Sequence, residues 1–256
     1  MNIESKHATS EALSKVPELT LVFWIIKIMA TTLGETGGDA VSMSMDLGYL
    51  LSTAIFAFLF IGAVLVQIKA PKFHPVIYWA TIVASTTVGT TLADFATRSL
   101  GIGYAGGSAL LLALLLSSLF VWKRMMGSVA IADVSSPRSE LFYWVTIMFS
   151  QTLGTALGDW TADTAGLGYL GAAAIFAGLL MLVVVAYFWT KVSRTTLFWT
   201  AFILTRPLGA VVGDFLDKPL ANGGLALSRY SASAILAVFI VALVLLLPHR
   251  AAKQSH

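Results

Sequence analysis

Residues 144–163 read WVTIMFSQTLGTALGDWTAD, and the pattern they carry recurs along the whole chain. A Trp is followed ten residues later by a Gly and, five residues after that, by an Asp. Successive Trp residues are 55, 65 and 55 positions apart, so the copies form two halves offset by 120 residues. A fixed internal period of this kind indicates similar structural units packed against one another. The four copies are Trp24/Gly34/Asp39, Trp79/Gly89/Asp94, Trp144/Gly154/Asp159 and Trp199/Gly209/Asp214.

The composition is that of an integral membrane protein. Of the 256 residues, 57% are hydrophobic and 11% are charged, with a mean hydropathy of +0.84, whereas soluble domains contain about 25% charged residues. The chain has no Cys, which excludes disulfides and thiolate metal sites. The basic balance arises from loop residues and does not indicate nucleic-acid binding. No stretch resembles a soluble catalytic domain, so we do not expect an enzyme.

Eight stretches are long and apolar enough to cross a membrane as helices. About 20 apolar residues span the hydrocarbon core as a helix, and isolated strands would leave their backbone unsatisfied in lipid. The first stretch of each pair carries the motif and the second is nearly featureless. The sequence therefore predicts an all-α integral membrane fold made of four parallel helix hairpins. The stretches are 19–39, 47–68, 75–95, 103–122, 141–161, 167–190, 195–215 and 230–248.

The hairpins fall into two pseudo-symmetric halves, 19–122 and 141–248, joined by a polar linker at 123–140 and flanked by tails at 1–18 and 249–256. Most of the 16 Lys and Arg residues lie in the tails, the linker and the loops on the same side as these segments. Because basic loops stay in the cytoplasm, we expect both termini there. The predicted location is the bacterial inner membrane, with the motif acids toward its outer face.

Each motif helix carries a polar stripe. Residues eight, eleven and fifteen positions after the Trp share one helical face. In the first copy these are Thr32, Glu35 and Asp39, a ladder of oxygen atoms that ends in a carboxylate. The other copies carry Thr87, Thr90 and Asp94; Thr152, Thr155 and Asp159; and Pro207, Ala210 and Asp214, with Asp163 one turn beyond Asp159.

These stripes predict a shared cation site near the outer face. Small residues such as Gly34 and Gly38 recur at four-residue spacing, which permits close helix contact, so we expect the motif helices to pack together at the centre. The expected path-lining hydroxyls belong to Thr32, Thr87, Thr90, Thr152 and Thr155. The expected metal ligands are Glu35, Asp39, Asp94, Asp159, Asp163 and Asp214.

Simpler interpretations of the same residues stay open. The four Asp residues lie near the outer edge of the hydrocarbon, where each could belong to a separate solvated turn. Two features favour a shared site: negative charge is disfavoured at a helix C-terminus, and Glu35 lies within a predicted span, where ionisable residues usually mark an ion or proton path. The four motif Trp residues have a plain explanation as an interfacial aromatic belt.

Two predicted spans also contain a cation, Lys27 and Arg206. We expect both to compensate the charge of the acids. They either form structural ion pairs or compete with a bound cation, and the sequence does not separate these roles.

The expected chemistry follows from the ligand types. Carboxylate and hydroxyl oxygens without His or Cys suit hard cations such as Mn²⁺, Mg²⁺, Ca²⁺ or Al³⁺. Clustered acids also repel one another and retain protons, which a cation can displace. The partners are thus a metal cation, protons and the lipid bilayer, without a resident cofactor, and the sequence leaves a homodimer open.

The runs 34–39 (GETGGD) and 157–163 (LGDWTAD), set in the fourfold repeat, resemble a bacterial family of uncharacterised membrane-anchored proteins built from a short membrane repeat of unknown function. The resemblance covers almost the whole chain. It implies metal tolerance, including manganese and aluminium, and hence a proton-coupled exporter. Two other functions stay open: an exporter of organic cations coupled to protons, and a membrane receptor or assembly factor without transport.

Overall fold

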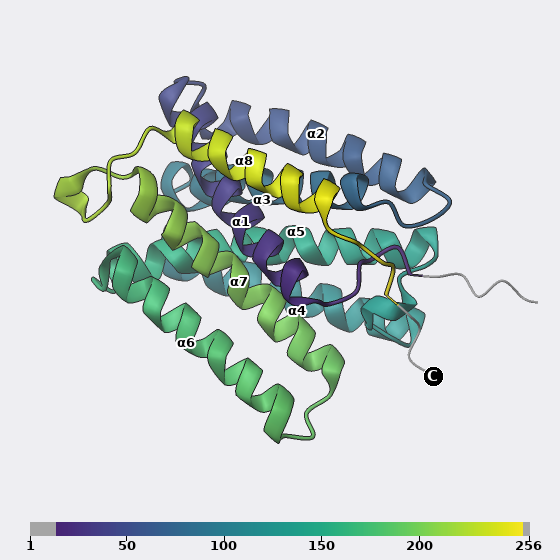
Figure 1. Cartoon of the computed structure of the whole chain (residues 1–256). Helices are drawn as coiled ribbons and strands as arrows, with labels where there is room; N and C mark the ends of the chain where they lie inside the picture. The colour runs from purple at the N-terminus through teal and green to yellow at the C-terminus, as the bar shows by residue number, and fades with distance from the viewer. Residues whose placement is uncertain (1–13, 253–256) are drawn as a thin grey trace, which may run out of the picture.

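The computed structural model describes residues 14–252, so parts of both predicted tails, 1–13 and 253–256, lie outside the described residues. Figure 1 shows a bundle of long helices whose described part contains no β-strand. The predicted all-α membrane fold with eight helices is confirmed. The helices are α1 (Leu21–Asp39), α2 (Gly48–Lys69), α3 (Pro75–Asp94), α4 (Gly103–Met126), α5 (Pro137–Asp159), α6 (Gly168–Trp189), α7 (Arg194–Asp217) and α8 (Arg229–Leu246).

The helices end close to the predicted positions except around the central linker. α4 runs on to Met126 and stops at Gly127, whose φ of +79° favours glycine. α5 begins four residues earlier than predicted, because Ser136 and Ser139 form a reciprocal capping box around Pro137 at the first turn. The non-helical linker therefore narrows from 123–140 to 127–136, within which Ile131–Asp133 forms a single 3₁₀ turn, η3.

The motif helices α1, α3, α5 and α7 form a closed ring. Each packs against its two neighbours in that order, and α7 closes onto α1. The plain helices lie outside the ring, and each packs on the motif helix of the next repeat: α2 on α3, α4 on α5, α6 on α7 and α8 on α1. The two helices of one repeat hardly touch each other. The two helices of each predicted hairpin are thus consecutive in sequence, but the second helix packs on the following repeat rather than on its own partner.

A recurring turn directs each plain helix toward the next repeat. After the motif Asp, the first three copies continue into one wider π-helical turn: η1 (Ala40–Ser44), η2 (Phe95–Ser99) and η4 (Trp160–Thr164). The following helix starts at Gly48, Gly103 or Gly168, with φ of +71°, +71° and +64°. Copy four differs, because α7 runs on to Asp217 and a longer loop at 218–228, which contains the short turn η5 (Leu220–Asn222), precedes α8.

Small residues set the spacing of the ring. The motif Gly of each copy, ten positions after the Trp, contacts the residue seven positions after the Trp of the next copy. A Cβ on Gly89 would lie 2.7 Å from the Gln151 Cβ, and a Cβ on Gly213 would lie 2.7 Å from the Glu35 Cβ. The predicted close contact along the small residues is confirmed. The motif pairs are Gly34 with Thr86, Gly89 with Gln151, Gly154 with Arg206 and Gly209 with Thr31.

The prediction that the motif Trp residues form a lipid-facing belt is wrong. Trp79 and Trp144 are each 2% exposed, Trp199 is buried, and Trp24 packs against the same cluster. They lie with other aromatic rings where the motif helices begin, and this packing fills the inner end of the ring. Tyr78 and Tyr143 share a hydrogen bond of 2.6 Å there. The aromatic residues fill one end of the ring, because their side chains face neighbouring motif helices rather than the lipid.

Segments from both chain ends and the linker cover this aromatic end. The backbone N–H of Lys15 donates to the Val134 carbonyl at 2.9 Å, and the N–H of Ala252 donates to the Val16 carbonyl at 2.8 Å. The first and last described segments accordingly lie on the same side in Figure 1, where the coloured ribbon begins and ends. The motif acids occupy the other end of the ring, as the sequence predicts.

Six helices are long and apolar enough to cross a membrane: α2, α3 with its following turn, α4, α6, α7 and α8. In the described chain, α1 and α5 do not reach this level, since they carry many of the polar residues that the ring encloses. Large apolar side chains cover the outward faces of the plain helices. The protein is therefore a multi-pass membrane protein whose polar centre is shielded from lipid.

Candidate functional site

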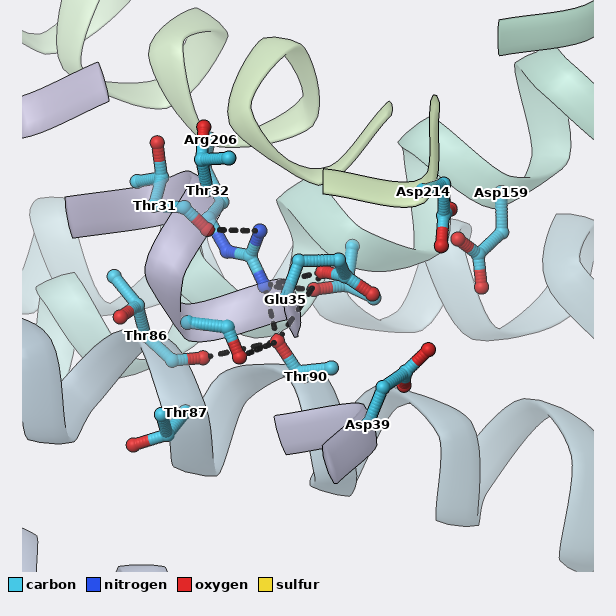
Figure 2. Close-up of polar contacts among 12 residues, drawn as sticks. Thr31, Thr32, Glu35, Asp39, Thr86, Thr87, Thr90, Asp159, Arg206 and Asp214 are labelled. Atoms are coloured by element: carbon cyan, nitrogen blue, oxygen red, sulfur yellow. Dashed lines mark hydrogen bonds and ion pairs between the residues drawn. The ribbon is translucent and has the colours of Figure 1, made fainter. Parts of the chain in front are cut away.

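The four motif acids are buried at one level of the ring. Asp39, Asp94 and Asp159 end their ring helices, and Asp214 lies three residues before the end of α7. All four are between 0 and 3% exposed. Separate solvated turns are therefore excluded as an account of these residues. Figure 2 shows the side chains of Asp39, Asp159 and Asp214 grouped beyond the Glu35–Arg206 pair.

Two cations divide the four acids into pairs. Arg98 bridges two helices, with Nε 2.9 Å from Asp94 Oδ1 and Nη2 3.0 Å from Asp159 Oδ2. Lys218 does the same on the opposite side of the ring, where its Nζ contacts Asp39 Oδ2 and lies 3.0 Å from Asp214 Oδ1. Each cation stands four residues after the Asp of its own helix and also reaches the Asp of the next.

A third outer cation adds to the Lys218 side. Arg229 Nε donates to Asp217 Oδ2 at 2.8 Å, and its Nη2 lies 3.6 Å from Asp39 Oδ2. Arg98, Lys218 and Arg229 were not predicted as partners of the buried acids. For Arg98 and Lys218 the signal was present, because an acid and a cation four residues apart face each other on a helix.

Lys218 lies just beyond the end of α7. Burial opposes the charged form of its amine, but the nearby carboxylates of Asp214, Asp39 and Asp217 outweigh burial and raise the pKa of Lys218 above its ordinary value. The amine is therefore positively charged at neutral pH.

Arg206 forms a second layer, two turns deeper than Asp214 on its own helix. Its guanidinium is fully buried, and Nη2 lies 3.1 Å from Glu35 Oε2 and 2.6 Å from the Thr90 hydroxyl. Nη2 also contacts the Thr155 hydroxyl, and Nη1 donates to the Thr31 carbonyl at 3.4 Å. All four ring helices thus meet at one side chain (Figure 2). Arg206 compensates Glu35, and Thr90 and Thr155 lie in the centre as the sequence predicts.

Among the described residues, the hydroxyls of the other three threonines bond only within their own helices. Thr32, Thr87 and Thr152 donate their hydroxyls to carbonyls of their own helices, at 3.0, 3.1 and 3.0 Å. Thr87 also lines an apolar groove of about 460 Å³ between α3 and α8. The residues seven positions after the Trp, one step earlier, are the ones that cross to the preceding ring helix. Thr86 Oγ1, for example, donates to the Ala30 carbonyl at 3.1 Å.

The prediction that Asp163 is a metal ligand beside the motif acids is also wrong. Its side chain is exposed, and it lines an outer cavity of about 650 Å³ together with Arg98, Lys218 and Arg229. The wide turn after Asp159 carries it away from the buried acids. Asp163 is thus a residue of the entrance, not of the cluster.

Lys27 does not compensate any acid. Its Nζ is buried without a hydrogen-bond partner among the described residues and lies 4.1 Å from the centre of the Phe202 ring. The expected ion pair is absent because Lys27 lies eight residues, about two turns, before Glu35, and Arg206 takes the position opposite Glu35.

Replacing Lys27 by Met is expected to raise the free energy of unfolding by about 1–2 kcal/mol, because an apolar side chain of similar length removes an unpaired buried amine. Unfolding in detergent measures the change. Lys15→Met is the matched control and should destabilise, since Lys15 Nζ lies 2.7 Å from the buried Glu140 Oε1. A loss of stability in Lys27→Met would show that the amine has a partner in the folded ring.

Three of the six expected ligands come together in a candidate metal site. Glu35, Asp39 and Asp214, from α1 and α7, each offer one carboxylate oxygen, and these oxygens lie within 4.8 Å of one another. Asp39 Oδ1 is buried and has no hydrogen-bond partner within residues 14–252. Asp94 and Asp159 form a separate pair held by Arg98. The acids therefore do not form one fourfold site, but a cluster of three and a separate pair.

Comparison with known families gives the same fourfold division. A model described as Repeat of Unknown Function (DUF347) matches residues 22–73, 77–128, 142–193 and 197–251. Each match covers one motif helix and the plain helix that follows it. No curated protein and no solved structure matches the chain. The matches span most of the sequence, and the chain therefore belongs to the family of membrane proteins built from the DUF347 repeat.

Proposed function

We propose that the protein binds a hard metal cation between α1 and α7 and carries it across the membrane. The observation that supports this most is the cluster of Glu35, Asp39 and Asp214, whose ligand atoms lie within 4.8 Å of one another and away from bulk water. Oxygen ligands from several carboxylates are what Mn²⁺, Mg²⁺ and Ca²⁺ prefer.

The charge balance of the contacting groups also favours a cation. Six acids take part in the outer ion pairs and the Arg206 layer, whereas four cations face them. When all six acids are ionised, they exceed the cations by two charges in a largely buried space, where uncompensated charge is unfavourable. A divalent cation would neutralise it. The acids are Glu35, Asp39, Asp94, Asp159, Asp214 and Asp217, and the cations are Arg98, Arg206, Lys218 and Arg229.

The ring supports a path from the acid end. The outer cavity is lined by Arg98, Lys218 and Arg229, the cations that pair with the buried acids. The Arg206 layer lies beneath the acids, and the aromatic residues fill the far end. We propose that the far end is cytoplasmic, because basic residues concentrate there, and that the membrane is the bacterial inner membrane. Export in exchange for protons, with tolerance to manganese or aluminium as its outcome, rests on the family resemblance and on the chemistry of clustered acids.

Titration calorimetry on the purified protein with Mn²⁺, Mg²⁺, Ca²⁺ and Al³⁺ tests the proposal. Asp39→Asn is expected to weaken binding about tenfold or more, because it removes one carboxylate ligand. Asp94→Asn is the matched control: Asp94 holds the same motif position and is equally buried, but lies outside the cluster. Its affinity should stay within about twofold of the wild type. Repeating the titration in two buffers of different ionisation enthalpy reports the protons released.

The two variants also separate other outcomes. Equal weakening by Asp39→Asn and Asp94→Asn would support the fourfold site that the sequence alone predicts. If the wild type binds none of the four metals, the proposal of a cation site is wrong.

A membrane receptor or assembly factor is the second candidate. One observation favours it: each of the buried acids of the ring lies within ion-pair distance of an Arg or Lys. Such pairs can simply hold the four repeats together. In that case both Asn variants would lower stability without changing any metal affinity.

A further inference from the structure

Lys218 occupies the candidate cation site itself. Its Nζ contacts Asp39 Oδ2 and lies 3.0 Å from Asp214 Oδ1, so it touches two of the three carboxylates in the cluster. The third, Glu35, is held by Arg206. A metal ion that binds this cluster therefore meets an amine that is already there.

The amine also stands between the cluster and the entrance. Lys218 lines the outer cavity and keeps 12% of its side chain exposed, whereas the side chains of Asp39 and Asp214 are 1% and 5% exposed. An ion arriving from the cavity reaches the amine before it reaches the carboxylates.

The backbone of Lys218 is fixed, and its side chain is the part that can move. The carbonyl of Lys218 accepts a hydrogen bond of 2.9 Å from Ala226 N–H, and Leu225 N–H donates to the Phe215 carbonyl at 2.7 Å. Gly224 lies so close that a Cβ on it would come within 2.7 Å of the Lys218 carbonyl carbon. The loop at 218–228 thus anchors the base of a flexible four-carbon side chain.

Arg98 provides the comparison within the same molecule. It holds the same position in copy two, four residues after the motif Asp, and likewise bridges two acids. Its guanidinium makes separate contacts with Asp94, Asp159 and, at 3.4 Å, the Tyr49 hydroxyl. The planar guanidinium of an arginine with several fixed partners does not easily leave its carboxylates. A lysine amine is a point charge on a flexible stem and can leave more readily.

We propose that Lys218 is a tethered occupant of the cation site, and that cargo binds by exchanging with its amine. This rests on the proposed function, because it names what the incoming ion displaces. The amine then sets selectivity: a monovalent ion replaces one positive charge by another and gains little, whereas a divalent ion brings additional charge to the carboxylates. Lys218 thus favours multivalent over monovalent cargo.

Lys218→Met tests the exchange. The wild type, Lys218→Met and Arg98→Met are purified, checked for folding by circular dichroism and gel filtration, and titrated with Mn²⁺ in the presence and absence of Na⁺. Lys218→Met is expected to bind Mn²⁺ about tenfold or more tightly than the wild type, because the site is no longer self-occupied. It should also become sensitive to Na⁺ competition, whereas Arg98→Met, which removes a cation from the neighbouring acid pair without emptying the cluster, should gain clearly less affinity and no new sensitivity to Na⁺.

The outcomes are distinguishable. If the wild type binds Mn²⁺ and Lys218→Met binds it no more tightly, the exchange is wrong and the cation site stands. An equal gain in Arg98→Met overturns the exchange as well, since the effect is then one of net charge. If neither the wild type nor Lys218→Met binds any of the metals, both proposals fall. Lys218→Gln carries the same test if Lys218→Met does not fold, because its amide removes the charge but can still donate to Asp39.

Discussion

Replacing Arg206 by Met is expected to lower the free energy of unfolding by about 3–5 kcal/mol, because it leaves a buried carboxylate without its cation. Arg206 is fully buried, and Nη2 lies 3.1 Å from Glu35 Oε2. The same side chain joins hydroxyls from α3 and α5, so its loss also leaves Thr90 and Thr155 without a common partner. Unfolding of the purified protein in detergent measures the loss.

The double variant Glu35→Gln/Arg206→Met identifies the cause. If the ion pair dominates, removing both charges should recover most of the stability, and the effects of the single variants will not add. Lys27→Met is the control for burial alone, since Lys27 is another fully buried cation of the ring but has no acidic partner in the described part of the chain. The two cation-to-Met changes are expected to have opposite signs. Strictly additive effects of Glu35→Gln and Arg206→Met would show that the pair contributes little.

Much of the architecture could be predicted from the sequence because it depends on length, apolarity and period. Uninterrupted apolar stretches predict the helices, and a motif repeated at the same place in four of them brings its residues to one level. This is why Asp39, Asp94, Asp159 and Asp214 were expected near one another, as they are found. Their buried neighbours Thr90 and Thr155 follow from the same period.

The pairing within that level depends on packing that the period does not determine. The residues that contact a neighbouring ring helix lie seven, eleven, fifteen and nineteen positions after the Trp, a ridge in steps of four that fits the groove between small residues on the neighbour. The predicted stripe at eight, eleven and fifteen shares two of these positions. It fails at Thr32, Thr87 and Thr152, because one step along a helix turns a side chain by about 100°.

The partners of the acids were missed for a related reason. Arg98 and Lys218 each join their own Asp to the Asp of the next helix, and which helix comes next depends on how the ring closes. Aromatic residues at the start of a membrane span can lie either at the membrane–water interface or in a contact between helices, and the sequence does not distinguish the two. Burial of Trp79 and Trp144 inside the ring is a tertiary result.

Gly89→Ala is expected to destabilise the protein by about 3 kcal/mol, the upper part of the range for overpacking a tight contact. The added Cβ would lie 2.7 Å from the Gln151 Cβ, 3.0 Å from the Gln151 carbonyl carbon and 3.1 Å from the Thr152 nitrogen. A side chain can rotate away, but backbone atoms cannot, so α3 and α5 must separate and the ring must open. Unfolding in detergent reports the change in stability, and the Mn²⁺ titration reports whether the acids keep their spacing.

Gly62→Ala is the matched control for this substitution. Gly62 lies within α2, and a Cβ there meets nothing within 4 Å. Alanine favours a helix over glycine by about 0.5–1 kcal/mol, so this variant should be neutral or slightly stabilised. The same change would then have opposite effects on a ring helix and on an outer helix, which follows only if the four repeats meet through their motif glycines. Equal stability of the two variants would mean that the motif helices do not approach as closely as the ring requires.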